Sequence, residues 1–444
     1  MQQATQPGSR RRTVWTALTV LVLAAPVALT VWRTGEGKLL STVLVAVGVV
    51  ALVAMGVATV APSRVRGLTA AFGIDRVITV HRWLGILAIA AALTHLVLAV
   101  VRSPKLLNPL AASLSIQWGW AATVAMVGVG LVAALGRRSG RRYEVWARVH
   151  VLLAAASLVL AALHVFWLGH LISDPVLRVV LSALALGFLA VLFLRWVWRP
   201  LFSRDGAYVV YGVRPEGPST ATLVLAPVHM HRGLRFHPGQ FVWLRLRRSV
   251  LGTEEHPFTI ASSARVTGRL ELTVRDAGDF SATLASLPTG SRVWLDGPHG
   301  AFTSAPEAPG LVLIAGGVGI TPMMSMLRTL AEGEDRRTHH LVVAQRPDEP
   351  LFEPELASLA RRLDLRVTRT AGRRVDAALL GSVLPPEPWR GELDYFVCGS
   401  PSLLAGSLAA LEQLGVPAER VNTEQFGWSG PLPVPDRDRS RNAG

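Results

Sequence analysis

Apolar residues are distributed unevenly along this chain of 444 residues. In roughly its first 200 positions they form long runs, and six runs reach the length of about 20 residues that a helix needs to cross a membrane. The predicted spans are residues 14–32, 39–61, 78–101, 115–135, 145–168 and 176–198. The pattern therefore predicts a six-helix transmembrane bundle.

From Tyr208 onward the pattern changes to short runs in which apolar and polar residues alternate, as in half-buried strands. These runs are Tyr208–Val213, Ala221–Val228, Phe241–Leu246, Phe258–Ser262, Leu270–Arg275 and Arg292–Asp296. Six short strands in succession indicate an antiparallel six-stranded β-barrel.

After Gly310 an apolar strand is followed by a glycine-rich turn and a helix, and further strands are predicted at 340–345, 365–370, 394–398 and 420–424. This alternation is typical of a doubly wound parallel α/β domain. No internal sequence repeat is evident. We expect a tail at 1–12, the bundle at 13–200, the barrel at 205–305, the α/β domain at 306–428 and a disordered tail at 429–444.

The formal net charge of +15 raises the question of nucleic-acid binding. Lys38 and Lys105 are the only lysines, and many arginines of the first half lie between the apolar runs. There they set orientation in a bilayer, so we expect no nucleic-acid partner. The positive-inside rule predicts a multi-pass protein of the cell membrane with both termini in the cytoplasm. The first apolar run has span length and no clear cleavage site, so we interpret it as a retained helix.

Four histidines stand at equal spacing on two predicted spans: His81 and His95 on the third, His150 and His164 on the fifth. Fourteen residues bring each pair onto one helix face and separate its members by about 21 Å. Since both helices start at the arginine-rich side, His81 should lie level with His150, and His95 with His164. Polar rings are costly in hydrocarbon, and two coplanar imidazoles on opposite faces of an iron porphyrin would satisfy both. Packed core histidines or a non-haem metal are the alternatives.

The single cysteine, Cys398, excludes an intramolecular disulfide and any cluster or zinc site that needs several cysteines. Further motifs are His-Pro-Phe-Thr-Ile-Ala-Ser at 256–262, Gly-Pro-His-Gly at 297–300, Gly-Gly-Val-Gly-Ile-Thr-Pro at 316–322 and Cys-Gly at 398–399. With the histidine pairs, they make the chain resemble the ferric reductase and NADPH oxidase superfamily over residues 40–428. The resemblance implies FAD, two b-type haems and NADPH or NADH as electron donor.

By this resemblance, Phe258 packs on the flavin ring, Thr259 hydrogen-bonds near the atom that accepts hydride, and His256 faces the ribityl chain or pyrophosphate. Arg275 is a possible substitute for an arginine that many relatives have at His256. The turn before a short helix offers N–H groups and a hydroxyl to phosphate, with a plain capped turn as the alternative. The candidate flavin residues are His256, Pro257, Phe258, Thr259, Arg275, Gly278, Asp279, Phe280, Ser281 and Gly297.

The glycines of the 316–322 loop let a dinucleotide approach the backbone, Thr321 is the expected N-cap, and Pro322 fits the first helical position. Cys398 and Gly399 end a strand at which relatives position the nicotinamide. Arg346 is the candidate for an adenosine 2′-phosphate, and Phe426 for the aromatic ring that shields the flavin. The candidate nucleotide residues are Gly316, Gly317, Gly319, Thr321, Pro322, Arg346, Cys398, Gly399 and Phe426. His256, Thr259, Cys398 and Phe426 are the predicted catalytic residues.

The sequence thus predicts an NAD(P)H-dependent flavohaem oxidoreductase that passes electrons across a lipid bilayer. Its acceptor outside the cell is dioxygen, as in a superoxide-forming NADPH oxidase, or a ferric complex, as in a ferric reductase. One alternative is an electron-transfer subunit that serves a membrane or extracytoplasmic partner protein. Another is a soluble-type flavin reductase that the spans merely anchor. Homo-oligomerisation also stays open.

Overall fold

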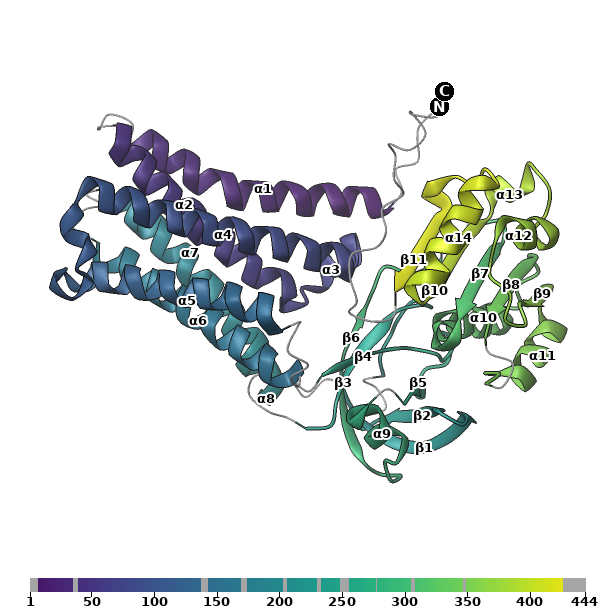
Figure 1. Cartoon of the computed structure of the whole chain (residues 1–444). Coiled ribbons are helices and arrows are strands. Elements are labelled where there is room, and N and C mark those ends of the chain that lie inside the picture. Colours follow the sequence, from purple (N-terminus) through teal and green to yellow (C-terminus); the bar gives the residue numbers. More distant parts are fainter. Residues whose placement is uncertain are drawn as a thin grey trace. The chain divides into compact units, whose positions relative to one another are not determined.

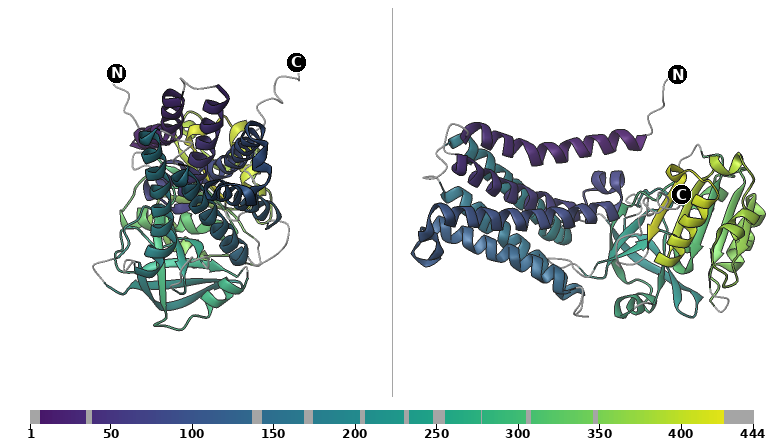
Figure 2. Two further views of the ribbon diagram at one scale, coloured as in Figure 1. Left: turned by 90° about the vertical axis from the view of Figure 1, so that its left-hand side faces the viewer. Right: turned by 45° about the horizontal axis from the view of Figure 1, so that its top comes forward.

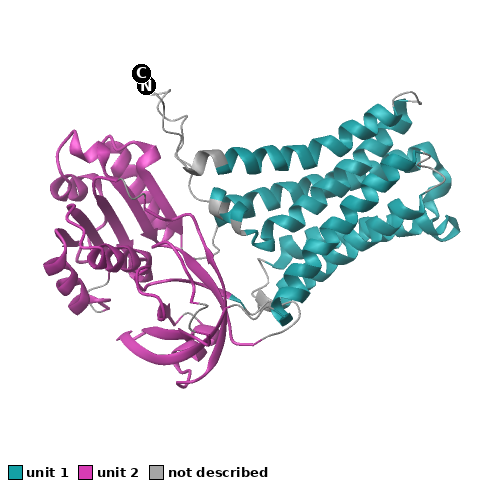
Figure 3. Cartoon of the chain, turned by 180° about the vertical axis from the view of Figure 1, so that it is seen from behind, with its two compact units in different colours: residues 1–203, 248–255 teal, residues 204–247, 256–444 magenta. Residues whose placement is uncertain are grey.

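The computed structural model describes residues 7–34, 39–136, 143–168, 174–202, 206–229, 233–247, 255–276, 278–304, 308–345 and 349–425. By its contacts the chain divides into two compact units (Figure 3). The first comprises residues 1–203 with 248–255, and the second residues 204–247 with 256–444. Helices form the first unit, and both sheets belong to the second.

Six long helices run side by side in the first unit (Figures 1 and 2). They are α1 (Pro7–Thr34), α2 (Leu39–Val60), α4 (Ile74–Arg102), α5 (Leu114–Gly136), α6 (Tyr143–Trp167) and α7 (Pro175–Phe193). All six are long and apolar enough to cross a membrane, which confirms the predicted bundle. Shorter helices join or extend them: η1 (Ala61–Ser63), α3 (Arg66–Phe72), η2 (Pro104–Leu107), η3 (Pro109–Ala111), the π-helical η4 (Leu194–Trp198) and α8 (Arg199–Phe202).

Small residues hold the helices of the bundle close together. Ala54 of α2 and Ala88 of α4 are buried, and a Cβ at Gly56 would lie 2.0 Å from the ring of Phe188 on α7. Close approach of backbones is how helices associate in lipid, where burial of apolar groups gives little driving force. Large apolar side chains such as Val97 and Val124 are exposed instead, as contact with lipid tails requires.

The first sheet of the second unit has the strand order β4-β3-β6-β1-β2-β5, and each neighbouring pair is antiparallel. Its strands are β1 (Ala207–Gly217), β2 (Thr220–Pro227), β3 (Phe241–Arg245), β4 (His256–Thr259), β5 (Leu270–Arg275) and β6 (Arg292–His299). An isolated bridge between Ile260 and Leu272 joins the two outer strands. The six-stranded barrel predicted from alternation is therefore confirmed, with α9 (Asp279–Ala285) packed on its side.

The second sheet is parallel throughout, in the order β11-β10-β7-β8-β9. Its strands are β7 (Leu311–Gly316), β8 (His339–Ala344), β9 (Leu365–Arg369), β10 (Asp394–Gly399) and β11 (Val421–Gln425). The helical segments are η6 (Gly317–Ile320), α10 (Thr321–Glu332), α11 (Glu353–Arg362), α12 (Ala377–Val383), α13 (Trp389–Glu392), α14 (Pro401–Gln413) and η7 (Ala418–Arg420).

One core packs α10 and α11 on one face of this sheet, and another packs α12 and α14 on the opposite face. The predicted doubly wound fold is thus confirmed. The chain direction across the sheet reverses between β7 and β10, and ligands of such folds bind beyond the carboxyl ends of the strands at this point. The glycine-rich loop follows β7, and Cys398 lies at the end of β10.

Candidate functional site

The four histidines of the bundle meet in two pairs. The ring centres of His81 and His150 are 6.1 Å apart, and those of His95 and His164 are 6.3 Å apart. When two imidazoles bind one metal ion from opposite sides, with metal–nitrogen bonds of about 2 Å, their ring centres are about 6 Å apart. The geometry of each pair therefore suits a single metal between two rings.

The rings are not coplanar as predicted, since their planes cross at 68° in the first pair and 80° in the second. Three of the four rings are oriented by a contact with a backbone carbonyl. His81 Nδ1 lies 2.8 Å from the carbonyl oxygen of Ala58, His95 Nδ1 2.8 Å from that of Leu44, and His164 Nδ1 2.6 Å from that of Ser115. Acceptors on α2 and on α5 thus orient the rings of His95 and His164 independently.

A carbonyl oxygen can only accept a hydrogen bond, so Nδ1 of these three rings carries the proton and Nε2 is the nitrogen that can bind a metal. His150 is held differently, because its ring stacks on Trp146 at 5.6 Å and 21°, while the Trp146 indole donates to the carbonyl of Val132 at 2.8 Å. The described residues contain no cluster of three or more histidine, cysteine or acidic side chains that could hold a metal. Such a centre in the bundle would have to bring its other ligands with it, as a porphyrin does.

Two glycines leave space for the rings of His95 and His164. A Cβ at Gly48 would lie 2.8 Å from the His95 ring, and a Cβ at Gly119 would lie 2.8 Å from the His164 ring. Each glycine stands four residues after the carbonyl that the same ring contacts. The helix pairs α2/α4 and α5/α6 therefore repeat one design, although no repeat is evident in the sequence.

In the barrel, β4 carries the His-Pro-Phe-Thr motif beside α9. The rings of His256 and Phe280 are 4.0 Å apart, and those of Phe258 and Phe280 are 6.4 Å apart and nearly parallel at 15°. These rings are partly exposed, whereas Thr259 is buried. The arrangement is an aromatic surface on which a flat ring can stack.

The turn before α9 lies next to this aromatic surface, because Phe280 is the second residue of α9. Gly278 has a φ of 148°, and α9 begins at Asp279. The Ser281 hydroxyl donates to the Gly278 carbonyl at 2.8 Å, so here it closes the first turn of the helix. Gly297 packs on β3, since its Cβ would lie 2.8 Å from Val242 Cγ1.

Arg275, at the end of β5, lies beside the nucleotide loop. Its Nη2 is 2.5 Å from Glu349 Oε2, and its Nη1 would be 3.3 Å from a Cβ at Gly317. Gly317 has a φ of +52°, which favours glycine. Arg275 thus joins the barrel to the loop that should receive phosphate.

The loop also departs from the prediction in its capping. Thr321 is not the N-cap: it is the first residue of α10, its hydroxyl donates to the Val318 carbonyl at 2.9 Å, and Ile320 precedes the helix. Pro322 is accordingly the second helical residue. The reason is that the chain already turns helically in η6, so the first free N–H groups lie nearer the strand.

Cys398 is fully buried in β10, paired with Ala315 of β7 and with Glu424 of β11. Burial, and to a lesser degree Glu424, raises the pKa of its thiol, which therefore stays protonated. A Cβ at Gly319 would lie 2.4 Å from the Cys398 carbonyl oxygen, and one at Gly399 would lie 2.7 Å from Leu403. Glycine is needed at Gly319 because loop and strand touch. Arg346 and Phe426 lie outside the described residues.

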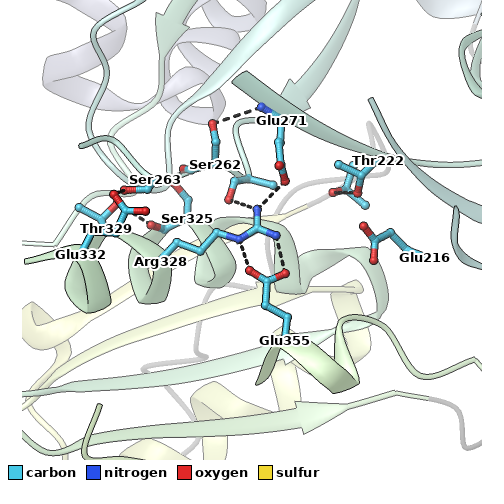
Figure 4. Close-up of polar contacts among 12 residues, drawn as sticks. Glu216, Thr222, Ser262, Ser263, Glu271, Ser325, Arg328, Thr329, Glu332 and Glu355 are labelled. Atoms are coloured by element: carbon cyan, nitrogen blue, oxygen red, sulfur yellow. Dashed lines mark hydrogen bonds and ion pairs between the residues drawn. The ribbon is translucent and has the colours of Figure 1, made fainter. Parts of the chain in front are cut away.

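Sequence reasoning missed a polar network centred on Arg328 of α10 (Figure 4). Its guanidinium contacts Glu355 of α11 at 2.6 and 2.7 Å, the Ala261 carbonyl at 2.7 Å, and Glu271 of β5 at 3.0 Å. The only feature of the sequence that could have indicated this network was an arginine on the otherwise buried face of a helix. Met323, Met324 and Met326 on that helix are core residues.

Comparison with protein families identifies three regions: a ferric reductase-like transmembrane component at residues 47–161, an oxidoreductase FAD-binding domain at 214–304 and an oxidoreductase NAD-binding domain at 313–407. Together with the six long apolar helices, these matches define a class: a membrane oxidoreductase of the flavin and nicotinamide type. The chain therefore has the architecture of the ferric reductase and NADPH oxidase superfamily.

The curated relatives each match about half of this chain. The reductase component of propane 2-monooxygenase from Rhodococcus jostii is 28% identical over 232 residues, 48% of this chain and 61% of that protein. An NADPH oxidoreductase from Mycobacterium tuberculosis is 31% identical over 250 residues, 53% of this chain and 64% of that protein. The chain thus spans somewhat less than two thirds of these relatives. A solved FAD/NAD-binding domain of nitric oxide dioxygenase from Vibrio cholerae has 24% identity and a TM-score of 0.43, and covers 50% of this chain and 99% of that one.

Proposed function

We propose that the chain passes electrons from cytoplasmic NAD(P)H to an acceptor outside the cell, with FAD on the barrel and two b-type haems between the histidine pairs. The haem part rests on one observation above the others: four imidazoles in two pairs, each at the separation of two ligands of one metal. Bound FAD would take a hydride and release electrons singly, and the haems would carry them one at a time.

In this proposal the residues of the second unit bind and orient. Phe258 and Phe280 stack on the flavin ring, Thr259 offers a hydroxyl near its reactive edge, and His256 faces the ribityl or pyrophosphate part. Arg275 would give up its ion pair with Glu349 and offer its positive charge to phosphate. Gly278, Asp279, Ser281 and Gly297 complete the flavin site, and Pro257 keeps β4 at the barrel edge.

The nucleotide would lie along Gly316, Gly317 and Gly319, where side chains are absent and N–H groups of η6 and α10 face the phosphates. Cys398 and Gly399 would contact the nicotinamide. Because the Cys398 thiol stays protonated, it acts by shape and weak hydrogen bonding and not as a nucleophile. Arg346 and Phe426 keep the roles assigned by resemblance.

In the bundle, the backbone carbonyls of Ala58, Leu44 and Ser115 fix the tautomer of three ligands. The four histidines would hold each iron through an imidazole on either side, and iron held in this way would supply one-electron transfer of the outer-sphere kind. We further propose that the arginine-rich connections face the cytoplasm, which makes His95 and His164 the exit side.

The experiment is to follow NADPH and NADH oxidation by purified full-length protein with two acceptors. One arm contains dioxygen and a superoxide detector, and the other contains a ferric chelate without oxygen. The proposal predicts flavin-dependent turnover in at least one arm, and the faster arm identifies the acceptor. Failure of both nucleotides to reduce the bound flavin would overturn the proposal.

A further inference from the structure

Helix α10 contacts the barrel through one polar face. Ser325 donates to the Ser262 carbonyl at 2.8 Å, and the Thr329 hydroxyl accepts from the Ala264 N–H at 2.9 Å. One turn further on, Glu332 accepts from the Ser263 hydroxyl at 3.3 Å. Figure 4 shows these side chains on the side of the helix that faces Ser262 and Ser263, which lie in the segment between β4 and β5.

Arg328 lies on the same face and reaches three elements at once. Nε and Nη2 form a fork on the two oxygens of Glu355, while Nη1 donates to the Ala261 carbonyl and to Glu271. Its side chain is only 11% exposed. The planar guanidinium of arginine can form a bidentate hydrogen bond with one carboxylate and still donate hydrogen bonds to other acceptors.

The two ends of this network have functional neighbours. Ala261 follows Thr259 by two residues, so it continues the strand of the flavin motif. Helix α10 begins directly after the Gly316–Ile320 loop, so its position sets the position of that loop. Arg328 therefore connects the backbone that carries the flavin residues to the helix that carries the nucleotide loop.

We propose that Arg328 is a positioning residue for hydride transfer: its fork on Glu355 and its bonds to Ala261 and Glu271 set the distance between flavin and nicotinamide. This inference rests on the proposed function of the same site. Misplacement by about 1 Å costs up to about 100-fold in rate, so loss of the network should slow hydride transfer without weakening nucleotide binding. Arg328 itself would touch neither ligand.

A matched control is available on the same carboxylate. Arg214 contacts Glu271 at 3.3 Å and Glu216 at 2.9 Å, yet its side chain is 48% exposed and both of these partners lie outside α10. Arg214→Met thus removes an arginine from Glu271 without touching the link. Arg328→Met removes the link, and Arg328→Lys keeps the charge while losing the fork.

The experiment measures anaerobic flavin reduction by stopped flow in the full-length protein, over a range of NADPH concentrations. We expect the limiting rate in Arg328→Met to fall between about tenfold and 100-fold, with the apparent dissociation constant within about twofold of wild type. The isotope effect with NADPH deuterated at the transferred position should rise. Arg328→Lys should be intermediate, and Arg214→Met should behave as wild type.

FAD content and thermal unfolding of each variant separate positioning from folding. If Arg328→Met loses FAD, then Arg328→Lys decides, and it must combine full FAD with a lowered limiting rate. The inference is overturned if an FAD-replete Arg328 variant reduces its flavin at the rate of Arg214→Met. If the wild-type flavin is not reduced at all, the proposed function fails and not this inference alone.

Discussion

The histidines of the two units differ in what holds each ring nitrogen. In His81, His95 and His164 of the bundle, Nδ1 faces a backbone carbonyl and Nε2 is left for a metal. In the α/β domain, His339 accepts the Leu311 N–H at Nδ1, at 3.2 Å, and its Nε2 contacts Asp335 at 3.2 Å. Both nitrogens of His339 are therefore used within the fold, and it has a structural role.

His339 should make the stability of the α/β domain depend on pH. Burial lowers its pKa below 6.5, with the Asp335 contact opposing. Below about pH 6.5 the unfolded chain takes up a proton that the folded domain does not, so stability is full above this pH and is lost as the pH falls. One proton changes the free energy of unfolding by at most about 1.4 kcal/mol per pH unit. Thermal unfolding between pH 5 and 8, in steps of about half a pH unit, measures this dependence of stability on pH.

The variant His339→Asn keeps an acceptor near the Nδ1 position and cannot titrate. We expect its stability to vary less with pH than that of wild type, although buried His340, whose pKa burial also lowers, leaves a residual slope. Replacement of the exposed His237 by Asn is the control. Equal slopes in His339→Asn and wild type would show that His339 does not contribute.

At the scale of elements, apolar periodicity was a good guide because burial determines it. The predicted spans fall within α1, α2, α4, α5, α6 and α7 or their direct extensions, and the predicted strands match β1 to β11 to within a few residues. The capping of α10 was predicted wrongly, since the η6 turn takes place before Thr321. The Arg328 network was missed because its partners lie far apart in the chain, where no period reports them.

Gly119 of α5 gives a test of the repeated helix-pair design. Gly119→Ala would place a Cβ 2.8 Å from the His164 ring and should displace it from the Ser115 carbonyl. We expect the haem proposed between His95 and His164 to be lost or to shift in midpoint potential, while the haem proposed between His81 and His150 is retained. Haem content and a spectroscopic redox titration measure both.

Gly85 provides the control for this variant. It lies on α4 between His81 and His95, and a Cβ there meets nothing within 4 Å. Gly85→Ala should therefore keep both haems at wild-type potentials. Loss of both haems in Gly119→Ala, or of neither with unchanged potentials, would argue against the design.

On the scale of the whole molecule, the domain architecture follows from the sequence and is supported by three family matches. Motifs such as His-Pro-Phe-Thr and the 316–322 loop could be found because chemistry limits both residue type and spacing. The electron acceptor could not be predicted from the sequence, because outer-sphere transfer requires no dedicated set of residues to bind the acceptor. An anchored soluble-type reductase would need no paired histidines, so a measurement of haem content distinguishes it from the proposed function.

The most direct test of the central claim is the haem content of the purified full-length protein, combined with its reduction by NAD(P)H without oxygen. The account predicts two b-type haems per chain, reduced through bound flavin, and loss of one haem in His95→Ala. Thr94→Ala, which removes the exposed neighbouring hydroxyl, should keep both. A flavin-containing protein without haem, or a His95→Ala variant that retains both haems, would contradict the account.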